Sequence, residues 1–103
     1  RNGWIADYND PCSFLDMWYT DGGNNDAQYS NPDYDAAIDA AKATSDPAER
    51  MKAFHEAEDL LIGQDSVLAP IYFYTQPYML NPDIDGMYYT PLGYFFFGYT
   101  TKK

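Results

Sequence analysis

Two segments in the middle of the chain place apolar residues at the spacing of an α-helix. In the first, Tyr34, Ile38 and Ala41 follow one another at intervals of four and three residues, so one face of a helix would carry all three. Asn31 can accept hydrogen bonds from the free N–H groups of a first helical turn, and Pro32 suits the first helical position. The pattern therefore predicts a helix that begins at Pro32 and buries this face.

The second helical segment runs from Asp46 to Gly63. Asp46 is a favourable N-cap, Pro47 is a favourable first residue, and Glu49 stands where a capping box has its acid. Gly63 is a typical end signal, because glycine readily adopts the left-handed conformation that closes a helix. The face predicted to be buried consists of Met51, Phe54, Glu58 and Leu61, with Ala57 and Leu60 beside it.

Short elements separated by turns are predicted for the N-terminal part. The apolar run at residues 4–6 precedes the turn-forming sequence Asn-Asp-Pro at residues 9–11, which predicts a strand that ends in a loop. The glycines, asparagines and aspartates of residues 21–26 predict another loop. Between them, one or two helical turns are predicted for residues 13–19 from three apolar residues at helical spacing, Phe14, Met17 and Trp18.

Past the second helix the pattern changes to that of β-strands. Residues 66–74 are rich in β-branched and aromatic residues and predict a strand, in which Pro70 requires an edge or a bulge. Shorter strands are predicted at residues 78–80 and 87–90, on either side of a turn-rich stretch, and an aromatic run follows at residues 94–99. Two helices cannot cover so many aromatic rings, so we expect the chain to be a piece of a longer protein that supplies a partner surface.

Length and charge narrow the possible classes of protein. The chain has 103 residues, enough for one small domain but too few for two lobes. Sixteen acidic residues against six basic ones give a formal net charge of -10, which repels nucleic acids and anionic lipids. No apolar run approaches the roughly 20 residues that cross a bilayer. Residues 1–4 lack the features of a signal peptide, so we expect either an export signal that lies upstream or no export signal.

Candidate reactive and metal-binding residues are few. Cys12 and His55 lack the local signature of a cysteine protease. We therefore expect Cys12 to be a half-buried hydrophobic residue and His55 to lie on a helix surface. Residues 81–86 resemble the start of a calcium loop, but the twelfth position is leucine instead of glutamate, which favours a plain turn. The paired acids Asp33 and Asp35 fall in a first helical turn, where the helix dipole explains them. We therefore expect no catalysis, no metal and no cofactor.

A specific motif occupies the start of the chain, Gly3-Trp4-Ile5-Ala6-Asp7-Tyr8-Asn9-Asp10-Pro11. It resembles the G-W-x-A-D-Y-x-[DE]-P motif of bacterial oligopeptide-binding and dipeptide-binding proteins, the solute receptors of peptide ABC transporters (solute-binding protein family 5). The resemblance continues in order through the Asn24-Asn25 loop, the Asn31-Pro32 helix start, the Ala57-Glu58 helix and the Pro70-Ile71-Tyr72 stretch.

This resemblance implies an α/β fold, the C-terminal part of a two-lobed, periplasmic-binding-protein-like receptor of type II. Residues 1–75 would complete the second ligand-binding lobe, and residues 76–103 would return across the hinge to the first lobe. The implied function is to bind extended oligopeptides outside the cytoplasm, in a periplasm or as a cell-surface lipoprotein. The implied partners are the oligopeptide and a membrane ABC transporter permease.

The resemblance also implies a binding site. In this family the aspartate of the motif pairs with the α-ammonium group of the peptide, and here that residue is Asp7. A carboxylate at a strand end is a suitable partner, because an ammonium group loses several kcal/mol of hydration when it leaves water. From the residues alone, Asp7 could instead cap the following turn, with Trp4 as ordinary core. Other expected ligand contacts are the backbone of Gly3 and Ile5, the ring of Trp4 and, more weakly, the loop residues Asn24 and Asn25.

Two alternative functions remain open at this point. The family has members that bind nickel complexes, haem or oligosaccharides, so the ligand need not be a peptide. The chain could also be a self-sufficient interaction module, whose aromatic C-terminal face drives self-association or domain swapping. In isolation, we expect the chain to oligomerise and so cover residues 94–99.

Overall fold

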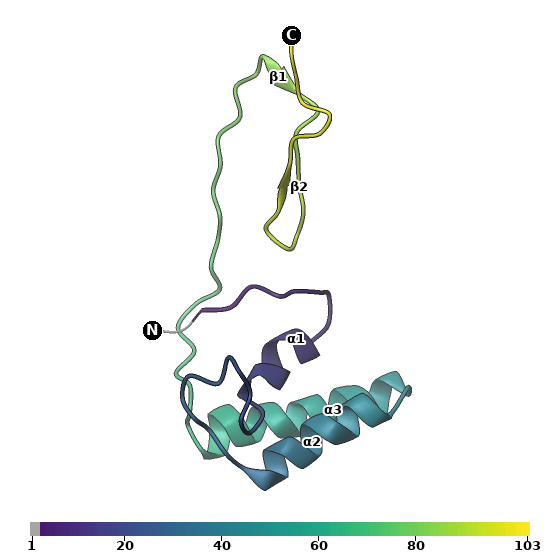
Figure 1. Ribbon diagram of the computed structural model, residues 1–103, viewed down its shortest axis with the longest axis vertical. Coiled ribbons are helices and arrows are strands. Elements are labelled where there is room, and N and C mark those ends of the chain that lie inside the picture. Colours follow the sequence, from purple (N-terminus) through teal and green to yellow (C-terminus); the bar gives the residue numbers. More distant parts are fainter. Residues whose placement is uncertain (1–2) are drawn as a thin grey trace.

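The computed structural model describes residues 3–103, an elongated molecule with its helices at one end and its strands at the other (Figure 1). Arg1 and Asn2, the first residues of the predicted lobe segment, lie outside this range. The radius of gyration is 18.1 Å, whereas a compact chain of this length would have about 13 Å. No helix within residues 3–103 combines the length and the apolar character that crossing a membrane requires.

Within residues 3–103, five helical elements precede four short strands. The helical elements are α1 (Cys12–Leu15), the 3₁₀ turn η1 (Asp16–Trp18), α2 (Pro32–Ala43), α3 (Pro47–Glu58) and the π-helical turn η2 (Asp59–Gln64). The strands are β1 (Ile84–Asp85), β2 (Tyr88–Tyr89), β3 (Phe95–Phe96) and β4 (Thr101–Lys102). The described chain is therefore a mixture of helix and strand, and the predicted helical turns at residues 13–19 are confirmed by α1 and η1.

Both long helices begin where the sequence predicts. The side-chain oxygen of Asn31 accepts hydrogen bonds from the N–H groups two and three residues further on, at 2.9 and 3.4 Å. Asp46 caps α3 in the same way, at 2.8 and 3.0 Å. Each cap satisfies N–H groups that have no partner inside the helix, so these side chains fix the first residue of α2 and of α3.

The core lies between α2 and α3, which run side by side as a helical hairpin (Figure 1). Its most deeply buried large side chains are Tyr34 and Ile38 of α2, Phe54 of α3 and Leu61 of η2. Full burial of a side chain of this size contributes roughly 1.5 to 3 kcal/mol. The predicted apolar face of the first helix is confirmed, since Ala41 is buried with Tyr34 and Ile38.

The predicted face of the second helix is only partly correct. Phe54, Ala57 and Leu61 are buried, but Met51 and Glu58 are exposed. Ala53 is buried instead, so the buried stripe lies on the side of the helix that faces α2. Glu58 stays in water because burying a carboxylate without a cation partner is costly.

The second helix continues past the predicted end at Gly63. Over η2 the hydrogen bonding widens, and the N–H of Asp65 donates to the carbonyl of Leu60 at 2.9 Å. The Asp65 carboxylate then accepts hydrogen bonds from the Tyr29 hydroxyl (2.7 Å) and the Asn31 amide (2.8 Å). These two bonds lower the pKa of Asp65. They also tie the end of η2 to the start of α2.

The C-terminal strands form two small antiparallel sheets. β1 pairs with β4, placing Ile84 opposite Lys102, and β2 pairs with β3, placing Tyr88 opposite Phe96. The strand predicted at residues 87–90 is confirmed as β2, and a turn within the stretch before it is closed by a hydrogen bond from the N–H of Ile84.

Three predicted strands are wrong, because residues 4–6, 66–74 and 78–80 lie in no strand. A strand needs a neighbour that accepts and donates its backbone hydrogen bonds, and the described residues provide none at these places. The side chains along the connecting segment are accordingly uncovered, with Ile71 at 87% and Phe73 at 100% exposure. The prediction that this chain cannot cover its own aromatic residues is confirmed for the part that the structure describes.

Replacing Asn31 with alanine is expected to destabilise the chain more than replacing Asp46 with alanine. Both changes remove a helix cap, but only Asn31→Ala also removes a hydrogen bond to Asp65. We expect a loss of about 1 kcal/mol in the free energy of unfolding for Asp46→Ala and a larger loss for Asn31→Ala, measured in urea. Equal losses would show that the Asn31–Asp65 contact adds nothing to stability.

Candidate functional site

The exposure of the predicted binding segment alternates from residue to residue. Gly3, Ile5 and Asp7 are exposed, whereas Trp4 and Ala6 are partly buried. Such alternation is typical of an extended chain that rests one row of side chains on a core and turns the other outward. The structure therefore brings three of the predicted contacts, Gly3, Ile5 and Asp7, to one exposed side.

Asp7 presents an exposed carboxylate with no hydrogen bond or ion pair among residues 3–103. Its backbone N–H donates to the Ser13 hydroxyl at 2.8 Å. The turn that follows is capped by Asp10, whose carboxylate accepts the N–H of Cys12 at 2.8 Å. The alternative in which Asp7 caps this turn is therefore wrong, and its carboxylate is available to a ligand.

Trp4 and Ile5 lie on opposite sides of the segment. Trp4 packs against the hydrophobic core, and its indole Nε1 is buried with no hydrogen-bond partner in the described chain. Ile5 points toward Gly93, in the turn between β2 and β3. The two residues are so close that a Cβ atom added to Gly93 would lie 3.9 Å from Cγ2 of Ile5. The same Cβ would lie 3.6 Å from Oε1 of Gln76, so three distant parts of the chain meet here.

The two predicted loop contacts, Asn24 and Asn25, differ in their surroundings. Asn24 is exposed. Asn25 is only 8% exposed, and its amide organises the loop by donating to the carbonyls of Trp18, Tyr19 and Tyr29 and accepting the N–H of Tyr29. A ligand contact by Asn25 remains a prediction, and it would have to replace one of these bonds. Asn25, but not Asn24, lines a hollow of about 450 Å³, together with Thr20, Asp21, Gly22, Gln28, Tyr29 and Ser30.

Sequence analysis missed an ion pair beside Asp7. Both carboxylate oxygens of Asp10 accept hydrogen bonds from the guanidinium of Arg50, at 2.5 and 2.8 Å. This bond lowers the pKa of Asp10, and the Arg50 side chain also lies over the Phe54 ring, 4.8 Å from its centroid. Asp10 and Arg50 are 40 residues apart, so periodicity and local spacing give no signal for the pair.

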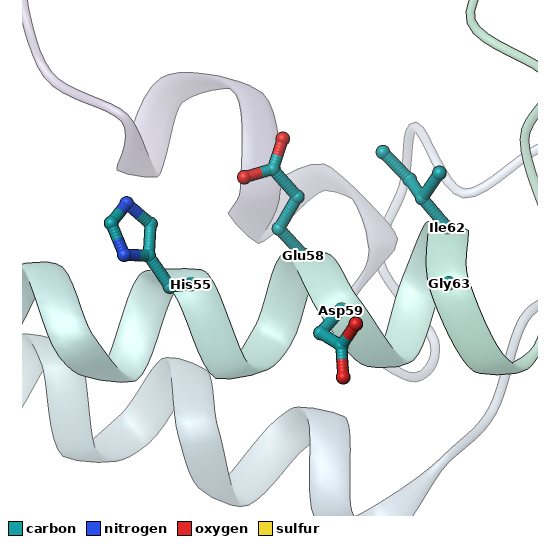
Figure 2. Close-up of a pocket in the computed structure, with 5 residues that line it drawn as sticks. All are labelled: His55, Glu58, Asp59, Ile62 and Gly63. Carbon is teal, nitrogen blue, oxygen red and sulfur yellow. The ribbon is translucent and has the colours of Figure 1, made fainter.

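A second hollow, of about 380 Å³, lies along the outer side of α3 and η2 (Figure 2). His55 and Glu58 extend from one side of the helix and Asp59 from the opposite side, so the three side chains do not converge. Within residues 3–103, no three His, Cys, Asp or Glu side chains are placed to hold a metal ion. Cys12, expected to be half-buried, is only 4% exposed and packs in the core.

Comparison with known proteins identifies binding proteins among the relatives of this chain. The periplasmic oligopeptide-binding protein OppA of Haemophilus influenzae is 38% identical over 86 residues, which is 84% of this chain and 16% of that protein. The dipeptide-binding protein DppE of Bacillus subtilis is 35% identical over 94 residues, 91% of this chain and 17% of that protein. The chain belongs to the family of the oligopeptide- and dipeptide-binding proteins.

The family resemblance covers only a part of each relative. The chain spans about 16% of the length of the relatives it matches. The probable deoxycholate-binding periplasmic protein YgiS of Escherichia coli is also a relative, 34% identical over 84% of this chain and 16% of that protein. Relatives at similar identity thus carry names for different ligands. No protein-family model matches the chain.

Acid is expected to weaken the contact between Asp10 and Arg50. Because the hydrogen bond from Arg50 lowers the pKa of Asp10 below its ordinary 3.8, the folded chain binds this proton more weakly than the unfolded chain does. The stabilisation is therefore complete above about pH 5 and is lost as the pH falls through the lowered pKa. The difference in unfolding free energy between wild type and Arg50→Gln should be constant down to about pH 5 and shrink below about pH 4. A difference independent of pH would contradict this.

Proposed function

We propose that the chain is part of an extracytoplasmic receptor that binds oligopeptides and presents them to a membrane ABC transporter. One observation carries the proposal: Asp7 ends an extended, exposed segment, and its carboxylate has no cation partner within residues 3–103. Relatives named for oligopeptide and dipeptide binding support this ligand class. The role is binding without catalysis.

The peptide would be held first by its ends and its backbone. Its α-ammonium group would pair with Asp7, and charge-assisted hydrogen bonds would offset the hydration that the ammonium group loses. The backbone groups of Gly3 and Ile5 would pair with the peptide as an added strand. Trp4 would form part of a pocket wall, and the loop at Asn24 and Asn25 would contribute weaker contacts.

In this proposal residues 1–75 belong to one lobe of a two-lobed receptor, and residues 76–103 return to the other lobe. The core of the described chain, with the apolar residues packed against it, ends at Leu68. Beyond it the chain is extended, and its exposed apolar residues need a covering surface. Closure of the lobes around a peptide would produce the form that the permease recognises, which requires tighter peptide binding by the closed form than by the open one.

The receptor would act outside the cytoplasm, in a periplasm or as a cell-surface lipoprotein. The names of two of the relatives above, which call them periplasmic, support the first of these places. A bile acid is a poorer ligand for this chain, because its carboxylate would be repelled by Asp7 and by the net charge of -10. An oligosaccharide, a nickel complex or haem would leave the ammonium-pairing role of Asp7 unused.

Replacing Asp7 with asparagine is expected to weaken peptide binding mainly through the lost contact with the peptide amine. Calorimetric titration of the full-length receptor with trialanine should show that Asp7→Asn and N-acetylation of the peptide each weaken binding by about 2 kcal/mol, roughly 30-fold. Asp33→Asn, which removes another exposed carboxylate, serves as the matched control and should leave the affinity unchanged. If wild type binds both peptides equally well, the ligand is not recognised through its amine.

Self-association of the isolated chain follows from its uncovered aromatic residues. The 103-residue chain alone is expected to form oligomers whose fraction rises with concentration, because association buries residues such as Phe73 and Phe97. Sedimentation velocity over a range of concentrations measures this. The full-length receptor should stay monomeric under the same conditions, whereas a self-associating module would oligomerise in both forms.

A further inference from the structure

We propose that the Asp10–Arg50 ion pair, together with Ser13, positions the Asp7 carboxylate for the ammonium group of the peptide. The proposal rests on the function proposed above, and it adds positioning residues to that site. None of the three would touch the ligand, since each would act through the backbone that carries Asp7.

Few interactions fix the position of Asp7 within residues 3–103. The hydrogen bond from its backbone N–H to the Ser13 hydroxyl, at 2.8 Å, is the one bond it makes within residues 3–103. Ser13 is 3% exposed, so this hydroxyl is a buried polar group whose partner is the Asp7 backbone. Loss of that bond would leave a buried hydroxyl unpaired, which makes the contact costly to break.

The corner between Asp7 and Ser13 is in turn fixed to α3. The carbonyl of Asp10 accepts the N–H of Ser13 at 3.1 Å, and the Asp10 carboxylate accepts the N–H of Cys12. The Arg50 guanidinium binds both oxygens of that carboxylate, a planar two-bond geometry that fixes orientation as well as distance. Because Arg50 lies over the buried ring of Phe54, a continuous set of contacts leads from the core to Asp7.

The ion pair also decides which carboxylate remains for a cation. Residues 7–16 contain three carboxylates, and two of them have cationic partners: Asp10 pairs with Arg50, and Asp16 lies 3.7 Å from the Lys42 ammonium. Only Asp7 has none in the described structure. Without Arg50, the unpaired Asp10 carboxylate would compete with Asp7 for the ammonium group of the peptide. Asp10 lies three residues further along the chain, so an ammonium group bound there would not align the peptide with residues 3–5.

The test is calorimetric titration of the full-length receptor with pentaalanine and with its N-acetylated form. Arg50→Gln is expected to weaken binding of the free-amine peptide about 10-fold or more, which is about 1.4 kcal/mol, and binding of the acetylated peptide less than about 2-fold. Lys42→Gln breaks the neighbouring ion pair and is the matched control, with less than about 2-fold change for either peptide. Arg50→Lys, which keeps the charge but not the two-bond geometry, should give an intermediate loss.

A second arm measures coupling between the sites. In an Asp7→Asn background, Arg50→Gln should cause no further loss, because the carboxylate that it positions is already gone. Equal losses for the free and acetylated peptides would mean that Arg50 only stabilises the lobe, and would overturn the proposal. So would an Arg50→Gln receptor that discriminates between the peptides as well as wild type does.

Failure of the proposed function itself has a different signature, because wild type would then bind both peptides equally. If circular dichroism shows that Arg50→Gln fails to fold, Ser13→Ala is compared with wild type instead. This variant removes the contact next to Asp7, and its binding of the free-amine and acetylated peptides is measured in the same way. A loss confined to the free-amine peptide supports positioning, and an equal loss for both peptides overturns it.

Discussion

The packing of α3 against α2 is the interaction on which the rest of the described structure depends. Phe54 and Tyr34 are both buried in the core, and the Tyr34 hydroxyl donates to the carbonyl of Leu15. That bond attaches α1 to the hairpin. Arg50 extends from the same helix as Phe54 and reaches Asp10, so the loop that carries Asp7 is positioned by the hairpin core.

Charge acts on two length scales in this chain. The net charge of -10 produces a field that attracts cationic groups and repels anionic ones, but a field of this kind does not orient a ligand. Orientation requires a fixed carboxylate without a partner, next to backbone groups that a peptide can pair with. Asp10 pairs with Arg50 and Asp16 with Lys42, so Asp7 is the carboxylate of its segment that has no cation partner within residues 3–103, and in the proposed receptor it would take that role.

The helices could be predicted from sequence because their signals are local. Asn31 and Asp46 cap the helices that they precede, and the apolar spacing of α2 identifies its buried face. Of the predicted strands, the one at residues 87–90 contains β2, but those at residues 4–6, 66–74 and 78–80 do not form. A strand is completed by a neighbour that can lie anywhere in the protein, so local sequence gives only part of its signal. The Asp10–Arg50 pair was missed for the same reason. The local sequence indicates only the turn for Asp10, although its carboxylate makes both the turn bond and the distant ion pair.

Residues 71–79 and residues 3–7 are extended and have no strand partner within the described chain. The two segments differ in how much apolar surface they expose to water. Residues 71–79 expose several large apolar side chains, among them Ile71, Phe73 and Met79, and each fully exposed one forgoes roughly 1.5 to 3 kcal/mol of burial. Such a surface requires a permanent partner, which the proposed receptor supplies from its other segments. Residues 3–7 turn only Gly3, Ile5 and Asp7 outward, and Ile5 alone is large and apolar. A segment with so little apolar surface can stay open to water between ligands, and that is what a reversible peptide site requires.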